Sequence, residues 1–188
     1  MMRASVNPDA RCAFFGCMKS DRNANLIHGF VNPQLQKQIE ELFPLVVAWV
    51  EQVEKEALEK GEPVLAPFEA TAEALGIRQI DKIRVWKVNT MPTPENPQIQ
   101  ALAERFGLSI AGSGGLTLGH AILVLRSQAT RGNLLAHELV HVRQYEQAGS
   151  ISLFLKRYVA ELVQFEYENM PLEREATREA AKYFAPWQ

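Results

Sequence analysis

Residues 134–145 read Leu-Leu-Ala-His-Glu-Leu-Val-His-Val-Arg-Gln-Tyr and contain a His-Glu-x-x-His pattern. On a helix, residues four apart share one face, so the imidazoles of His137 and His141 can reach a single ion. Glu138 projects about 100° further round the helix axis, where it can contact a metal-bound water. Such a carboxylate takes a proton as the water attacks a carbonyl and later passes it to the leaving amine. The pattern therefore predicts one zinc ion, with Glu138 as general base and acid.

The sequence around this pattern argues against two unrelated histidines on a surface helix. Apolar residues flank the pattern on almost every side of the helix, namely Leu134, Leu135, Leu139, Val140 and Val142. A helix that is apolar nearly all round is normally buried. Buried imidazole and carboxylate groups need partners, and a shared metal ion supplies them.

A third zinc ligand is expected from the helical segment 171–184. At about 100° per residue, Glu173 lies on the apolar face of this helix together with Ala176, whose small side chain permits close helix packing. Glu175 falls outside that face, near Arg178, where a solvated ion pair is the simpler role. We therefore expect Glu173 to be the third ligand, with Glu175 as the alternative.

These motifs resemble those of the gluzincins, in which HExxH is followed by a helix that carries Glu-x-x-Ala, here Glu173–Ala176. In that group the first Glu of this motif is the third zinc ligand. More narrowly, about half of the chain resembles a group of uncharacterised bacterial zincin-like proteins. The matching stretches are Ile83–Val85, Pro92–Pro94, Gly115–Gly119, His137–His141 and Pro171–Ala176. The resemblance implies a zincin core and a zinc metallopeptidase, but names no substrate.

One departure from the gluzincin pattern concerns the group that orients a ligand histidine. Thr177 stands where many gluzincins have an Asp after Glu-x-x-Ala. Gln144, almost one turn after His141, faces the metal side of its helix and is a candidate for this role. The carboxylate that would complete the arrangement is not assigned from the sequence.

The zincin resemblance also assigns roles to neighbouring segments. In that fold an edge strand precedes the active-site helix and pairs with an extended substrate. The expected strand is 120–126, with substrate contacts at His120, Ala121, Ile122 and Leu123. A Tyr or His donor near the developing oxyanion is also typical, and Tyr158, Tyr167 and His120 are the candidates. For each of them, structural packing is the alternative role.

Periodicity and turn residues predict an α+β fold of the zincin type. A small mixed or antiparallel sheet should pack against the HExxH helix, with helical N-terminal and C-terminal parts. Helices are expected at 33–60, 67–75, 96–106, 133–148, 152–168 and 171–184, and strands at 83–88 and 120–126. Pro44 should kink or split the first helix. The glycine-rich stretch 111–119 lacks the Lys-Ser/Thr of a P-loop, so it is interpreted as a turn before a strand.

The whole chain, 1–188, is expected to form one zincin-like domain. Residues 1–31 should be an irregular arm, residues 32–76 a helical part, and residues 77–188 the metallopeptidase core. The chain is 47% apolar and 22% charged, with a net charge of −2, which gives no general attraction to nucleic acid.

The cysteines and the apolar runs bear on the cellular location of the protein. Cys12 and Cys17 are the only cysteines, so no disulfide framework is implied. The longest apolar run, 42–50, contains a proline and is too short for a membrane span, and no signal peptide is seen. These features predict a cytoplasmic protein.

The function expected from these residues is that of a zinc-dependent peptidase acting on a peptide or protein substrate. The alternative is a catalytically silent zincin-like scaffold that binds zinc or serves as a protein-interaction domain. Glu138 favours the enzyme, because a purely structural zinc site would not need this residue beside an open coordination position.

Overall fold

The apolar run after the glycine-rich stretch forms an inner strand of a four-stranded sheet. The strands lie in the order β1 (Glu62–Pro63), β2 (Arg84–Val88), β4 (Ala121–Leu125) and β3 (Gly115–Leu118). β2 and β4 are parallel and the other pairs are antiparallel, so the sheet is mixed. This computed structural model describes residues 32–183, and the predicted arm with its two cysteines lies outside them.

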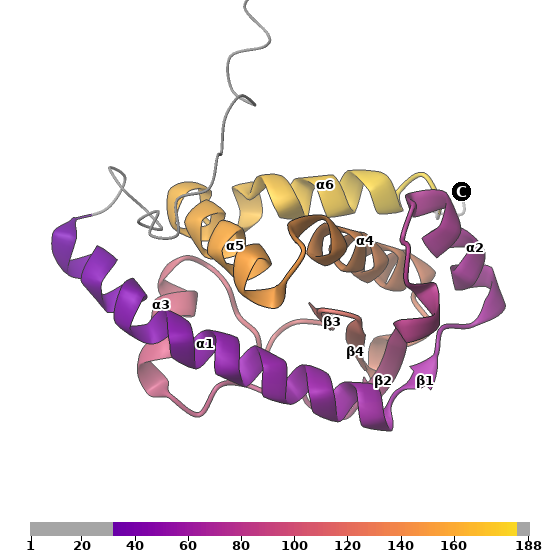
Figure 1. Cartoon of the computed structure of the whole chain (residues 1–188), viewed down its shortest axis with the longest axis horizontal. Helices are drawn as coiled ribbons and strands as arrows, with labels where there is room; N and C mark the ends of the chain where they lie inside the picture. The colour runs from indigo at the N-terminus through magenta and orange to yellow at the C-terminus, as the bar shows by residue number, and fades with distance from the viewer. Residues whose placement is uncertain (1–31, 184–188) are drawn as a thin grey trace, which may run out of the picture.

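Both faces of β4 are buried, which explains why its sequence is continuously apolar. Ala121 and Leu123 pack in one cluster with residues of helix α1 (Pro33–Lys60). Ile122 and Val124 face the opposite way, toward α4 (Gly132–Ala148). Figure 1 shows α1 along one side of the sheet and α4 on the other. The sheet therefore holds the HExxH helix against a rigid apolar layer.

The remaining helices confirm the α+β prediction, with small changes at their ends. They are α2 (Ala66–Leu75), α3 (Pro97–Arg105), α5 (Ile151–Phe165) and α6 (Pro171–Ala180), with 3-10 turns at Ile80–Lys82, Arg126–Gln128 and Tyr167–Asn169. The last two helices are shorter than predicted. Between residues 32 and 183, no helix is long and apolar enough to span a lipid bilayer.

Of the two alternatives predicted for Pro44, a kink or a split, the structure excludes a split of the first helix. α1 runs without interruption from Pro33 to Lys60 with Pro44 inside it. Proline removes the hydrogen bond to the carbonyl four residues earlier, which belongs to Glu40. Glu40 and Pro44 are both exposed, so water can satisfy that carbonyl.

The glycine-rich stretch also contains more regular structure than predicted. Its second half is the strand β3, which a two-residue turn at Gly119 and His120 joins to β4. Gly119 has φ +61°, a conformation that favours glycine in such hairpins. A Cβ there would also lie 2.6 Å from Cδ of Glu54, whose Oε1 accepts a hydrogen bond from the His120 N–H at 3.1 Å.

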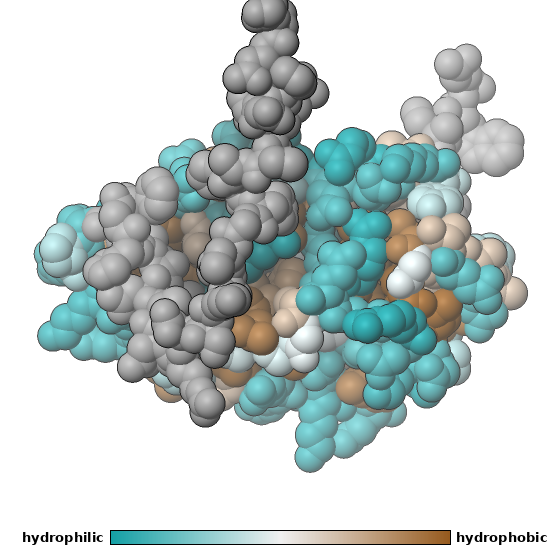
Figure 2. All heavy atoms as spheres, turned by 45° about the horizontal axis from the view of Figure 1, so that its top comes forward, coloured by the Kyte–Doolittle hydropathy of each residue, from teal (hydrophilic) through white to brown (hydrophobic). Residues whose placement is uncertain are grey.

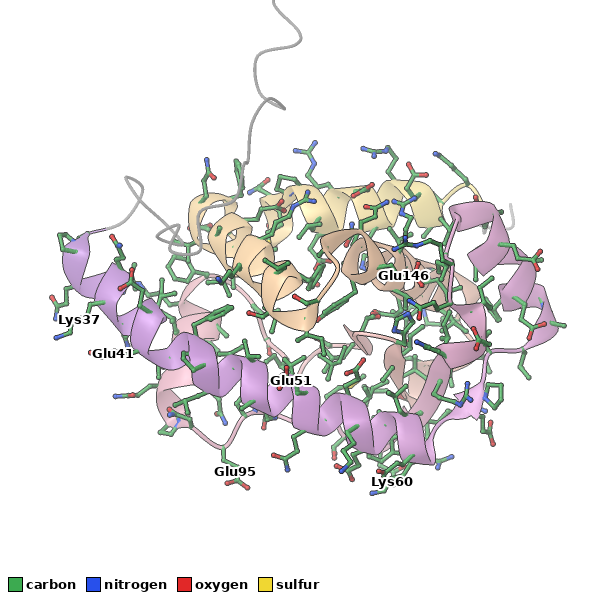
Figure 3. The ribbon with its side chains drawn as sticks, in the orientation of Figure 1. Lys37, Glu41, Glu51, Lys60, Glu95 and Glu146 are labelled. Atoms are coloured by element: carbon green, nitrogen blue, oxygen red, sulfur yellow. The ribbon has the colours of Figure 1, made fainter. Side chains whose placement is uncertain are left out.

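A buried carboxylate on α4 fastens this helix to the segment after α2. Glu146, whose side chain is 2% exposed, accepts hydrogen bonds from the backbone N–H groups of Arg78 and Gln79, at 2.8 and 2.9 Å. His120 Nε2 lies 3.2 Å from the same carboxylate. Figure 3 shows Glu146 well away from the labelled charged residues of α1. Burial raises the pKa of Glu146, but these hydrogen bonds outweigh it and hold the pKa below the ordinary value of 4.5.

We expect Glu146→Gln to lower the free energy of unfolding by about 1–3 kcal/mol at neutral pH, because an amide cannot accept from both N–H groups. The pKa is lower in the folded state, so the unfolded state binds more protons in acid. The contribution of Glu146 is therefore complete above the ordinary glutamate pKa of 4.5 and is lost as the pH falls through the folded-state value. Urea unfolding from pH 7 to pH 3 measures this.

The control for this prediction is Glu59→Gln, which makes the same change at an exposed position of α1. Its effect on unfolding should stay small and vary little with pH. A constant difference between wild type and Glu146→Gln across the pH range would contradict the role given to the charge.

Candidate metal centre

Two packed helices bring the predicted metal ligands together. His137 and His141 lie on α4, and Glu173 lies in the first turn of α6. Ala176, on the same face of α6 as Glu173, is fully buried in the cluster that contains Leu139 of α4. A small side chain at this contact lets the helix backbones approach closely. The glutamate can therefore reach both histidines.

The spacing of the three ligand atoms fits a tetrahedral ion. Nε2 of His137 lies 3.1 Å from Nε2 of His141 and 3.2 Å from Oε2 of Glu173. The remaining side of this triangle, from His141 Nε2 to Glu173 Oε2, is 3.5 Å. Atoms bonded to tetrahedral zinc at about 2.0–2.1 Å lie roughly 3.3 Å apart. This His-His-Glu group could thus hold a metal ion.

The electrostatics of the group also favour a cation between the histidines. Burial lowers the pKa of His141, but the carboxylates of Glu173 and Glu138 outweigh it and raise the value to about 9. Burial conversely raises the pKa of Glu173, yet both imidazoles hold it well below its usual range. In a buried site such mutual stabilisation of opposite charges is strong. A positive charge is therefore stabilised where the three ligand atoms converge.

A relay of hydrogen bonds fixes the ring of His141. Nδ1 of His141 lies 2.8 Å from Oε1 of Gln144, whose Nε2 donates to the carbonyl of Leu172 at 3.1 Å and to Oε2 of Glu175 at 2.9 Å. Flipping the amide would turn its oxygen toward two other acceptors, so only this orientation satisfies all partners. Nδ1 of His141 therefore carries the hydrogen, and Nε2 is left free to bind a metal.

Glu175 is thus placed as an orienting residue and not as a ligand. Its Oε1 accepts a hydrogen bond from Nη2 of Arg143 at 2.8 Å, while its Oε2 accepts from Gln144. Both oxygens therefore face away from the histidine Nε2 atoms. The structure favours Glu173 over Glu175 as the third ligand, and it gives Gln144 the position expected of a group that orients a ligand histidine.

The two predicted tyrosines meet at the same carboxylate. Tyr158 donates to Oε1 of Glu173 at 2.9 Å, and the hydroxyl of Tyr167 lies 3.5 Å from Oε2. Burial, followed by the charge of Glu173, raises the pKa of both phenols, so both are neutral donors at pH 7. Tyr158 leaves Oε2 of Glu173 available for an ion. Whether either tyrosine contacts a reacting group stays a prediction.

Glu138 is held against the edge of the sheet. Its carboxylate Oε2 accepts a hydrogen bond from Oγ1 of Thr117 at 2.6 Å, and its side chain is buried. A Cβ on Gly115 would lie 2.8 Å from Cδ of Glu138, so this position of the carboxylate requires glycine on β3. Among residues 32–183, no other side chain donates a hydrogen bond to Oε1 of Glu138. Thr117 and Gly115 therefore fix the position of the Glu138 carboxylate.

The prediction that 120–126 forms the edge strand is wrong. β4 lies between β2 and β3, so strands occupy both of its sides, and in the described part of the chain β3 is the edge beside α4. Ile122 and Leu123 are fully buried in the core, and His120 contacts Glu146 away from the ligands. The backbone that a substrate could pair with belongs to Gly115–Leu118.

An open cleft with both polar and apolar lining leads to the candidate metal ligands. It has a volume of about 830 Å³ and is lined by Gly114, Arg131, Asn133, His137, Glu138 and Thr177, among others. His137 is also the more exposed of the two histidines, with 22% of its side chain accessible against 9% for His141. A molecule in this cleft can therefore reach the ligand histidine and Glu138 together.

Several residues of the site were not found from the sequence. These are Thr117 and Gly115 beside Glu138, and Arg143, which donates a hydrogen bond to Glu175 behind His141. One signal was available, because two apolar runs separated by a glycine-containing pair are typical of a β-hairpin. Reading Gly115–Leu118 as the first strand of that hairpin would have paired it with strand 121–125, but not shown its contact with Glu138.

Comparison with models of known protein families, with curated proteins and with solved structures finds no match to the chain. The metal centre is therefore supported by the geometry and chemistry of the residues described above.

Replacing Gln144 tests the relay. We expect Gln144→Leu to weaken zinc binding about 10- to 100-fold, because His141 loses the acceptor that fixes its ring. A competition titration against a chromogenic chelator measures the Kd. Gln147→Leu, the same change at an exposed position of α4, is the control and should leave the Kd unchanged. Equal zinc affinity in the two variants would mean that Gln144 does not orient His141.

Proposed function

We propose that this protein is a zinc-dependent peptidase of the gluzincin type. The observation that carries the proposal is the convergence of His137, His141 and Glu173 next to a buried, anchored Glu138. Three protein ligands that leave one side open are typical of catalytic zinc, whereas structural sites are closed by four. The open cleft beside His137 and Glu138 supports the same conclusion.

Each residue of the centre has a role in this proposal. When bound, zinc supplies a Lewis acid and lowers the pKa of a coordinated water. Glu138 accepts a proton at Oε1 and returns it to the leaving amine, while Thr117 keeps Oε2 in place. Tyr158 and Tyr167 steady the Glu173 carboxylate, and Tyr167, which also lines the open cleft, is the better placed to donate to a substrate oxygen.

The substrate proposed is an extended peptide or protein segment bound along β3. An edge strand offers unpaired backbone groups that can bind another chain as an added strand. Gly114 and Gly115 line the cleft at this edge and allow a close backbone approach. Main-chain pairing fixes the direction of the peptide without reading its sequence.

A scaffold that binds zinc without turnover is the other candidate, and the surroundings of Glu138 speak against it. A structural zinc site does not need Glu138, and burying a carboxylate costs free energy. Gly115 and Thr117 are both needed to keep it there. A carboxylate buried and fixed in this way is expected where it exchanges a proton.

The ligand assignment is tested by removing each carboxylate of α6 in turn. Glu173→Ala should weaken zinc binding by more than about 100-fold, because it deletes a ligand, whereas Glu175→Ala should stay within the 10–100-fold of an orienting residue. Metal content after dialysis and chelator competition measure both. A larger loss in Glu175→Ala than in Glu173→Ala would show that the wrong carboxylate has been chosen as ligand.

The enzyme proposal is tested with Glu138→Gln. This variant should keep one zinc per chain but lose cleavage of unfolded protein substrates by about 100-fold or more, the usual contribution of a general base. Glu59→Gln, on the exposed side of α1, is the control and should cleave as the wild type does. If Glu138→Gln cleaves these substrates as fast as the wild type, the proposed mechanism is wrong. If neither protein cleaves them, the scaffold is favoured.

A further inference from the structure

A second, mostly apolar pocket opens on the other side of the metal ligands. It has a volume of about 170 Å³, and His137, Glu138 and Glu173 form part of its wall. The rest comes mainly from three helices, with Val46 and Trp49 on α1, Leu102 on α3, Phe106 at the C-terminal end of α3, and Val159 and Val163 on α5.

The walls of the pocket contain apolar side chains that the fold leaves partly exposed. Val46, Leu102 and Val159 are only half-buried, although each of their helices also carries buried residues. Leu35 and Ile39 pack α1 against the same wall, so α1, α3 and α5 are held together at this end. A ligand that covers half-buried apolar side chains gains free energy from the area it removes from water.

The chemistry of the lining selects against a charged ligand group. Among the described residues that line the pocket, none is Lys, Arg or Asp, and the ionisable groups are those of the metal centre and three tyrosines. A charged side chain would lose its hydration here without gaining a partner of its own. A dry apolar cavity of about 150 Å³ is large enough to bind benzene. The pocket therefore fits one aromatic ring or one leucine-sized side chain.

The position of the pocket connects it to the edge strand. Gly115 and Leu116 of β3 line this pocket, and Gly115 also lines the larger open cleft. In a peptide paired along β3, alternate side chains point to the same side of the strand. One of them can enter the apolar pocket while the peptide continues in the open cleft. Figure 2 shows a mostly hydrophilic surface on the face it draws, with apolar side chains in separate patches.

We propose that this pocket binds a single bulky apolar side chain of the substrate, next to the peptide bond that is cleaved, and thereby sets the specificity of the enzyme. This inference rests on the proposed peptidase function. Burying a Leu- or Phe-sized side chain contributes about 1.5–3 kcal/mol. Substrates with Phe, Leu or Met at this position should therefore exceed those with Ala by roughly 10- to 150-fold in kcat/KM.

The first experiment uses zinc-loaded full-length protein and a series of peptides that differ only at one position beside the cleaved bond. Cleavage with the expected preference for Phe, Leu and Met over Ala, Asp and Lys supports the pocket. Cleavage with equal kcat/KM for Phe and Ala overturns it and leaves the peptidase proposal standing.

A binding measurement separates failure of the pocket from failure of the peptidase. In Glu138→Gln loaded with zinc, the Phe peptide should bind about 10- to 150-fold more tightly than the Ala peptide, measured by calorimetry. This result supports the pocket even where the wild type cleaves no peptide. Equal Kd values for the two peptides overturn the pocket whatever the cleavage assay shows.

Filling the pocket provides the matched variants. Val46→Trp places a large side chain in the pocket and should reverse the preference from Phe to Ala, with zinc affinity unchanged. Leu45→Trp makes a similar change one residue away, at a side chain that is 50% exposed and does not line the pocket. It should keep the wild-type preference. If circular dichroism shows that Val46→Trp does not fold, Val163→Phe fills the pocket from α5 in its place. An unchanged preference for Phe in the folded variant overturns the proposal.

Discussion

Three ionisable groups that could hold a metal ion meet where α6 packs against α4. Oε2 of Glu173 is 3.2 and 3.5 Å from the two histidine Nε2 atoms, and all three groups are largely removed from water. Charges in such surroundings interact strongly and cost much when unpaired. The neighbouring contacts serve this arrangement, since Tyr158 holds the other oxygen of Glu173 and Gln144 holds the other nitrogen of His141. A cation that joins the three groups therefore stabilises the packing of the two helices as well.

Those parts of the site that lie within one helix could be predicted from the sequence. The spacing of His137 and His141 and the offset of Glu138 follow from helix geometry alone. Glu173 could be chosen over Glu175 because the apolar face of α6 must point toward the core. Helices and the two longer strands were found for the same reason, as their periodicity is a local property of the chain.

The parts that depend on pairing between distant segments could not be predicted. Strand 121–125 is apolar enough to be recognised, but its own sequence does not show that β2 and β3 pair with its two sides. Its inner position was therefore mistaken for an edge. Thr117 lies 21 residues before Glu138 and carries no sign of its partner in the sequence. The helix face of Glu175 made it only the alternative to Glu173 as a ligand, and its contact with Gln144 depends on how α4 and α6 pack.

The two glutamates of α6 show how one short segment can serve a metal centre twice. Glu173 and Glu175 point about 200° apart around the helix, so they cannot both face the ion. Glu173 reaches the imidazole nitrogens directly, whereas Glu175 reaches His141 from behind through the amide of Gln144, with Arg143 balancing its charge. One carboxylate thus belongs to the group that could hold a metal ion, and the other fixes a ring. The segment needs both glutamates at this separation, because moving either by one residue would turn it to a face where neither partner lies.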